Sequence, residues 1–344
     1  MVGPRARSSF FLLAAAAVLA LAAGTASAEL VAKLPQVMNP FFLSIAGGRM
    51  YIVENDATVH IYALEAGRVS FVKTFGRAGQ GPGEFDFIYA VRPFKDHLDI
   101  PGSAKLARFS LDGDYQSEIV FTVGAFKGAF YRLADRYVAR DIDFDDKGAT
   151  TTIRLYDKDL KLIKEIGRRT EPLNIMEKIN LVSGYYAPRV SGDRLYVIDS
   201  ARESIVAVYD RDGVLQRKIR LPLEPQKMTA ALRDAVIRTV KEGWAGRMPW
   251  AEYEKRLFFP DETPGLDYFE VLDGAFAART WKYRRDMVEF ALFDGQGREL
   301  KRLELPFTGR LSNGILFCFC EGRYYYLREN PGEEAWELHA EKAW

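Results

Sequence analysis

Val206-Ala207-Val208-Tyr209-Asp210-Arg211-Asp212-Gly213 and Phe290-Ala291-Leu292-Phe293-Asp294-Gly295-Gln296-Gly297 share one pattern: an apolar strand ends in an aromatic residue and a turn rich in Asp and Gly follows. Such turns suit a β-hairpin, because Gly tolerates positive φ and the Asp side chain can accept bonds from its own backbone. The unit recurs in shorter form at three places: Ile61-Tyr62 before Glu65-Ala66-Gly67, Phe109 before Asp112-Gly113, and Leu155-Tyr156 before Asp157-Lys158-Asp159. The pattern predicts a repeated hairpin.

The spacing of the aromatic residue predicts the architecture. It falls at positions 62, 109, 156, 209 and 293, in steps of 47, 47, 53 and 84. The last step fits one repeat plus an insertion, and a further step of 46 reaches His339, within a sixth unit. A period of about 40–50 residues with four strands per unit is typical of β-propeller blades. We therefore expect an all-β, six-bladed β-propeller.

The two ends of the chain predict how the ring closes. The sixth unit runs out of sequence after its third strand, at Trp344. Leu30–Pro35 resembles the outer strands expected at Arg217–Pro222 and Lys301–Pro306. Because an unpaired edge strand is a liability, we expect the N-terminal strand to complete the last blade.

The first 28 residues have the features of an export signal. Arg5 and Arg7 precede an apolar run from Phe10 to Ala23, and Ala26-Ser27-Ala28 offers a cleavage site before Glu29. The run of 14 residues is shorter than the roughly 20 needed to span a membrane, so an uncleaved anchor is the weaker alternative. With no cysteine near the site, we expect a periplasmic or secreted protein that is not a lipoprotein and that keeps no membrane span. Residues 1–28 are then the signal peptide and residues 29–344 the propeller.

Charge and cysteine content limit the possible partners. Lys and Arg total 48 and Asp and Glu 47; removing the two basic residues of the signal leaves 46 against 47, a net charge of −1. This balance gives no basis for nucleic-acid binding, which requires a basic surface. Cys318 and Cys320 lie two apart on an expected strand, with nearly parallel side chains that suit packing better than a disulfide; a redox role is the alternative. We expect a monomer.

The segment Phe75–Phe85 contains a glycine-rich motif, Gly76-Arg77-Ala78-Gly79-Gln80-Gly81-Pro82-Gly83-Glu84-Phe85. It resembles the G-x-x-G-x-G-P-G-E-F linker between blades of bacterial six-bladed propellers related to NHL-repeat and TolB-like proteins. The resemblance covers eleven residues and implies a fold without a particular reaction. A nucleotide-binding loop is disfavoured, because no Gly-Lys-Ser/Thr follows and the next segment is an expected strand rather than a helix.

Two stretches interrupt the repeat. One is the connection from Gly167 to Pro188, between the third and fourth blades. The other, at about 225–267, lies between the fourth and fifth blades and has apolar residues such as Met228, Leu232 and Val236 at helical spacing. Connections between blades emerge on one face of a propeller, so we expect both insertions above one mouth of the central channel. The helical insertion is either a lid or a packing element.

The candidate site residues come from the loops expected at this mouth. The ligand-binding candidates are Glu54, Arg77, Gln80, Glu84, Asp199, Arg279 and Arg328. Asp141, Asp143 and Asp145 form a weak metal-binding candidate because carboxylate oxygens are preferred Ca²⁺ ligands. They do not form an EF-hand, since Asp146 replaces the required Gly and Thr152 the required Glu.

Two functions fit these features. The first is a non-enzymatic exported propeller that binds a polar small molecule, a glycan or a protein at the mouth of the channel. The second is a calcium-assisted hydrolase or lyase, similar to lactonase and esterase propellers, with Glu54, Asp141 and Asp199 holding the ion. The three histidines His60, His97 and His339 belong to different blades, and no G-x-S-x-G or H-E-x-x-H motif is present. We favour the binding function and expect no cofactor, with Ca²⁺ as the one candidate ion.

Overall fold

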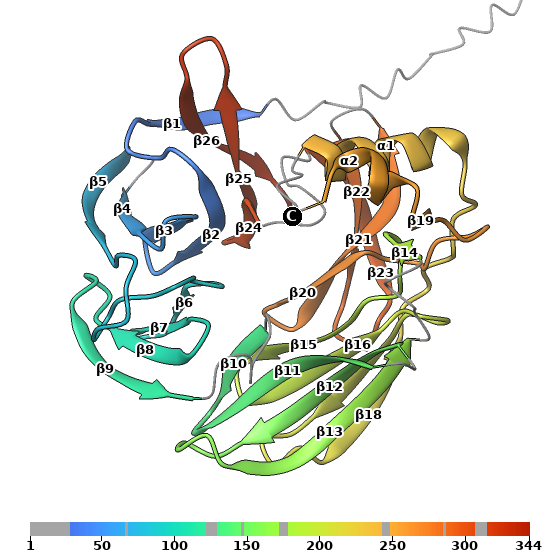
Figure 1. The fold of residues 1–344 in the computed structure, drawn as a ribbon, viewed down its shortest axis with the longest axis horizontal. Helices are drawn as coiled ribbons and strands as arrows, with labels where there is room; N and C mark the ends of the chain where they lie inside the picture. The colour runs from blue at the N-terminus through green and yellow to red at the C-terminus, as the bar shows by residue number, and fades with distance from the viewer. Residues whose placement is uncertain are drawn as a thin grey trace, which may run out of the picture.

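The computed structural model describes residues 28–65, 68–121, 129–145, 148–171, 178–242, 248–284, 287–306 and 315–344. The signal segment therefore lies outside the described residues, apart from Ala28. Six four-stranded antiparallel sheets form a ring, as predicted (Figure 1). Within the described chain, no helix is long and apolar enough to cross a membrane.

Each blade is built from strands in simple up-and-down order. Blade 1 contains β2 (Pro40–Ala46), β3 (Arg49–Glu54), β4 (Val59–Glu65) and β5 (Arg68–Phe75). Blade 2 contains β6 (Arg92–Pro93), β7 (Leu98–Pro101), β8 (Lys105–Phe109) and β9 (Tyr115–Val120). Blade 3 contains β10 (Ala129–Leu133), β11 (Arg136–Asp145), β12 (Gly148–Tyr156) and β13 (Leu162–Glu171).

The second half of the ring repeats this plan. Blade 4 contains β15 (Tyr186–Ser191), β16 (Arg194–Asp199), β17 (Ile205–Tyr209) and β18 (Leu215–Arg220). Blade 5 contains β20 (Tyr268–Leu272), β21 (Ala275–Arg284), β22 (Met287–Phe293) and β23 (Glu299–Pro306). Blade 6 contains β24 (Phe317–Cys320), β25 (Arg323–Asn330), β26 (Ala335–Lys342) and β1 (Glu29–Leu34).

The predicted closure of the ring is confirmed. Strand β1 pairs antiparallel with β26 as the outer strand of blade 6, with Leu34 opposite Trp336. Lys33 of β1 adds an ion pair to Glu333, in the turn between β25 and β26. Leu34 is fully buried between blades 6 and 1, so the closing strand also contributes to the core.

The repeated aromatic residue is the last residue of the third strand in blades 2 to 5, whereas Tyr62 lies three residues before the end of β4 in blade 1. At this residue the register with the fourth strand shifts in each of the five blades, which is a β-bulge. In the turn after Tyr209, Gly213 has a φ of 67° and Asp210 Oδ1 accepts bonds from the backbone of Asp212 and Val214. The sequence repeat is therefore a turn-and-bulge motif on the third and fourth strands.

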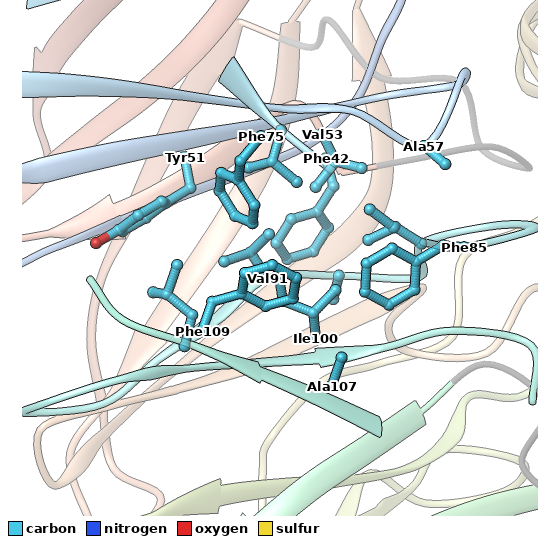
Figure 2. Packing of buried hydrophobic residues seen from close by; sticks show 14 of the residues in the cluster. Phe42, Tyr51, Val53, Ala57, Phe75, Phe85, Val91, Ile100, Ala107 and Phe109 are labelled. Carbon is cyan, nitrogen blue, oxygen red and sulfur yellow. The ribbon is translucent and has the colours of Figure 1, made fainter. Parts of the chain in front are cut away.

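The core is divided into six wedges, one between each pair of neighbouring blades. The wedge between blades 1 and 2 is the largest, with fifteen buried hydrophobic residues, and Figure 2 shows Phe42, Phe85 and Phe109 meeting inside it. Among the described residues, the wedge between blades 2 and 3 is the smallest, with five. Blade contacts are thus unequal around the ring.

The two faces of the ring have different connections. We call the face that carries the links between blades (such as 76–91) and the loops between second and third strands (such as 200–204) the linker face. The opposite face, with the turns at 134–135 and 157–161, is the turn face. Both predicted insertions leave the linker face.

The two insertions pack on one another. They contribute β14 (Ile179–Asn180), α1 (Ala230–Glu242), α2 (Trp250–Glu254) and β19 (Leu257–Phe258). Strands β14 and β19 pair in parallel and join the two insertions. Val236 of α1 packs against Val182 and Trp281, so the helix covers the extended end of β21 in blade 5 (Figure 1). In this region the helical insertion is a packing element.

Candidate functional site in the central channel

The first strands of the blades surround the axis of the ring. Strand β2 contacts β6 and β24, and β15 contacts β10 and β20. These strands carry large aromatic and charged side chains that meet from blade to blade. We call this set the channel cluster: Phe42, Arg92, Tyr131, Arg189, Tyr268, Glu270 and Phe317, with each blade contributing at least one member.

Arg189 is the most connected member of the channel cluster. It lies on β15 of blade 4 and is 5% exposed. Its Nη1 donates to Tyr131 Oη of blade 3 at 2.8 Å, and its Nε to Glu270 Oε2 of blade 5 at 3.2 Å. Its Nη2 donates to Tyr185 Oη at 2.7 Å. Burial disfavours its charge, but the hydroxyls and Glu270 outweigh this and raise the pKa of Arg189 well above its ordinary value. One guanidinium therefore joins three blades.

Arg92 is held differently. It lies on the two-residue strand β6, and its guanidinium stands over the rings of Tyr131, at 4.3 Å, and Phe42, at 5.7 Å. These are cation–π contacts between blades 1, 2 and 3. Its Nε is buried without a hydrogen-bond partner among the described residues. The side chain as a whole is half-buried, so this cation retains access to solvent.

Glu270 is the acidic member of the channel cluster, and it is already engaged. Its Oε2 accepts from Tyr268 Oη at 2.7 Å as well as from Arg189. Burial and the neighbouring Glu270 raise the pKa of Tyr268 well above its ordinary value, so the phenol stays protonated and donates. This carboxylate is therefore held as a hydrogen-bond acceptor.

Arg279, a predicted site residue, lies beside the channel cluster. Its guanidinium stands 5.4 Å from the Tyr268 ring and 5.7 Å from the Phe317 ring. Its Nε donates to Asp267 Oδ1 at 2.8 Å, and Tyr283 Oη donates to Asp267 Oδ2. Because Tyr283 also packs against the helical insertion, Asp267 links the insertion to the channel.

The predicted residues of the glycine-rich motif are partners of one another. Arg77 forms an ion pair with Glu84, and Glu84 Oε2 accepts from the Gly81 backbone at 2.9 Å. Gln80 Nε2 donates to Asp86. The Gly81 amide and then Arg77 lower the pKa of Glu84. Arg77 and Gln80 are exposed at the linker face. Glu84 instead stabilises the loop through its bonds to Gly81 and Arg77.

Glu54, Asp199 and Arg328 are separated from this group. Glu54 is 6% exposed, and its two oxygens accept from the backbone of Met38 and Asn39, which ties down the link from β1 to β2. Asp199 Oδ1 accepts from Arg169 Nη1 at 2.9 Å, beside the link between blades 3 and 4. Arg328 is exposed on β25. The predicted residues thus share a face, but the structure does not bring all of them into one cluster.

The metal candidates alternate along β11 and occupy different environments. Asp141 is 5% exposed and forms an ion pair with Arg154, whereas Asp143 and Asp145 are exposed. Asp145 Oδ1 accepts from the Gly148 backbone at 3.1 Å. Asp146 lies outside the described residues. No group of three or more His, Cys, Asp and Glu suited to a metal ion occurs in the described part of the chain. The Ca²⁺ assignment stays a prediction.

Sequence reasoning missed the principal members of the channel cluster. One signal was present: Ala187-Pro188-Arg189-Val190 places an arginine inside an otherwise apolar first strand. Lysine and arginine are almost never fully buried unless they are paired, so such a residue indicates a partner from another blade. Arg92 gave no comparable signal, because β6 is only two residues long and follows a long link.

Comparison with protein-family models and with curated proteins gives no match. Among solved structures, the chain is similar to a member of the DUF4221 family from Bacteroides vulgatus, with a TM-score of 0.50 and 12% identity over 91% of this chain and 94% of that one. It resembles BamB from Moraxella catarrhalis with a TM-score of 0.36 and 11% identity, over 88% and 84% of the two chains. It also resembles the computationally designed Ika8 protein, with a TM-score of 0.41 and 8% identity, over 91% and 99%. The first similarity supports the fold alone.

Proposed function

We propose that this chain is an exported, non-enzymatic binding propeller that takes a small anionic ligand beside Arg92, on the inner strands of the ring. The observation that carries the proposal is Arg92: a half-buried guanidinium held by two aromatic rings, with no hydrogen bond or ion pair to a carboxylate among the described residues. A cation fixed in this way suits the carboxylate of a ligand, because charge-assisted hydrogen bonds are strong where water is partly excluded.

The surroundings of Arg92 support binding rather than catalysis. Glu270 is engaged by Tyr268 and Arg189, and Asp267 by Arg279 and Tyr283. These carboxylates act as acceptors within the fold, and general acid–base chemistry or metal binding would require them to leave those partners. The aromatic rings of the channel cluster offer flat surfaces beside the cation. This combination fits a sugar acid or a small dicarboxylate.

Matched pairs of compounds test the proposal. We expect glucuronate and succinate to bind the mature chain more tightly than glucose and succinamide in isothermal titration calorimetry. Arg92→Gln should weaken the binding of the acid by about tenfold or more, consistent with the loss of a charge-assisted bond, and Arg92→Lys should lose less. Arg194→Gln, on the turn face, is the control and should bind like the wild type. Equal binding of the neutral compounds, or no effect of Arg92→Gln, would reject the proposal.

A further inference from the structure

A cavity of about 310 Å³ lies between blades 2 and 3, toward the turn face, and no member of the channel cluster is among its lining residues. This volume is at the lower end of the roughly 300–1,000 Å³ of small-molecule sites. Its lining includes Asp99 and Arg108 from blade 2 and Arg132, Asp135, Tyr137 and Lys158 from blade 3. Asp135 and Lys158 are exposed, so the cavity reaches solvent.

The cavity exists because this wedge of the core is thin. Its five buried hydrophobic residues, including Leu106, Phe130 and Tyr156, leave the turn-face half to polar side chains. Polar side chains cannot interdigitate as apolar ones do, because each must keep its hydrogen bonds. Blades 2 and 3 therefore enclose a cavity with a largely charged and polar lining.

Asp99 supplies an acceptor at this cavity. It is 3% exposed, and its Oδ1 accepts from Arg108 Nε at 3.0 Å. Its Oδ2 is buried without a hydrogen-bond partner among the described residues. A buried carboxylate oxygen that lacks a donor is costly, so a ligand that brings an N–H group would be stabilised there.

Arg132 supplies a cation to this cavity. Its Nε donates to the Ala134 carbonyl at 2.8 Å and its Nη1 to His97 Nε2 at 2.9 Å, and both acceptors are neutral. Since arginine only donates, His97 Nε2 must carry a lone pair; the ring proton then lies on Nδ1, which bonds Asp96 Oδ1 at 2.7 Å. Arg132 forms no ion pair with a carboxylate in the described chain, and Lys158, which forms an exposed ion pair with Asp159, lies at the same cavity.

Tyr137 stands between the two charges. It is 5% exposed, and its hydroxyl accepts from Arg108 Nη2 at 3.4 Å. Burial and then Asp99 raise the pKa of Tyr137, so its hydroxyl remains protonated. Asp99, which also pairs with Arg108, thus lies at one side of the cavity, and Arg132 and Lys158 supply cations; Glu118, Asp135 and the neutral Tyr137 hydroxyl complete its polar lining.

We propose that this cavity is a second binding site, for a small zwitterion that carries an ammonium and a carboxylate, such as an amino acid or a dipeptide. The ammonium would donate to Asp99, and the carboxylate would accept from Arg132 and Lys158. Each charge of the ligand then meets an opposite charge of the protein, which a ligand with one charge cannot achieve.

The test measures binding of the twenty protein amino acids and of alanyl-alanine, one at a time, by thermal shift and calorimetry on the mature chain. We expect at least one to bind. Acetylation of its amino group or amidation of its carboxylate should weaken binding tenfold or more. Ser117→Tyr should abolish binding: Ser117 lines the cavity from an exposed position on β9, so a larger side chain there fills space without disturbing the core.

Further variants separate the two ends and the two sites. Asp99→Asn should weaken binding of the zwitterion but not of its N-acetyl derivative, and Arg132→Gln should weaken binding of the zwitterion but not of its amide. Arg136→Gln, whose ion pair to Asp212 lies outside the cavity, and Arg92→Gln in the channel are controls that should bind normally. No binding by any of the compounds, binding unchanged in Ser117→Tyr, or equal binding of the capped derivatives would overturn the proposal.

Discussion

Lys105 shows how a single side chain holds the link between the first two blades. It is 7% exposed, and its Nζ donates to Glu118 Oε2 at 3.1 Å and to the Gly81 carbonyl at 2.8 Å. Glu118 Oε2 also accepts from the Gly83 backbone at 3.2 Å. A buried ion pair from blade 2 thereby fixes the glycine-rich motif, whose glycines let the backbone approach closely.

Removal of Lys105 should be costly. Lys105→Met leaves the buried Glu118 carboxylate without its cation, and we expect a loss of about 3 kcal/mol in the free energy of unfolding in urea. Lys105→Met/Glu118→Leu should recover part of this loss, because it removes the uncompensated charge. Lys73→Met is the control: its ion pair with Asp114 is exposed, so we expect less than about 1 kcal/mol. Equal losses for the two lysine variants would contradict this account.

Glu84 predicts a pH dependence of stability. In the folded state, the Gly81 amide and then Arg77 hold the pKa of the Glu84 carboxyl below its ordinary value of 4.5. Stabilisation by Glu84 is therefore fully present above the unfolded pKa and is lost as the pH falls through the folded pKa. We expect Glu84→Gln to lower the melting temperature by a few degrees at pH 7 and by less as the pH is lowered below 4.5. Glu203→Gln, from an exposed ion pair with Arg220, should change little at either pH. A constant difference between wild type and Glu84→Gln would contradict the prediction.

At the scale of elements, the closing strand β1 offers a matched pair of residues. Leu34 is fully buried in the wedge between blades 6 and 1, whereas Leu30 is 48% exposed on the same strand. We expect Leu34→Ala to lower the free energy of unfolding by about 3 kcal/mol, through lost burial and a cavity. Leu30→Ala should cost less than about 0.5 kcal/mol. Chemical denaturation of both variants checks this; similar costs would mean that β1 does not seal the ring through its buried face.

Much of the fold could be predicted because its signal is local. The turn after Tyr209 depends on Asp210 and Gly213, which lie within four residues of each other, and such a motif recurs visibly along the chain. The closure was predictable for a similar reason, since β1 resembles other outer strands in sequence.

The candidate site was less predictable because its contacts join distant segments. Tyr131, Arg189 and Glu270 meet only when three blades are assembled, and no spacing in the sequence encodes that meeting. Several loop candidates lie on the linker face, but reasoning from charge could not foresee that Glu84 and Glu54 accept hydrogen bonds from nearby backbone amides. Polar residues in tight links satisfy backbone amides first, because those donors are otherwise buried.

At the scale of the whole molecule, each blade packs against its two neighbours, so a side chain that contacts both neighbours couples three blades. Arg189 is the strongest of these, since it joins β10, β15 and β20. Arg189→Met removes the cation from Glu270 and leaves two tyrosine hydroxyls without their donor. We expect a loss of about 3 kcal/mol in the free energy of unfolding. Arg194→Met, on the neighbouring strand β16 with a half-exposed side chain, should cost less than about 0.5 kcal/mol.

Hydrogen exchange followed by mass spectrometry distinguishes a link between blades from local packing. If Arg189 couples three blades, exchange in Arg189→Met should accelerate together in peptides from β10, β15 and β20, while β3 and β4 of blade 1 change least. The reason is that local opening free energies fall where shared contacts are lost. If faster hydrogen exchange were confined to β15, the arginine would only fill space within blade 4. The channel cluster would then be a set of separate contacts rather than a continuous inner ring.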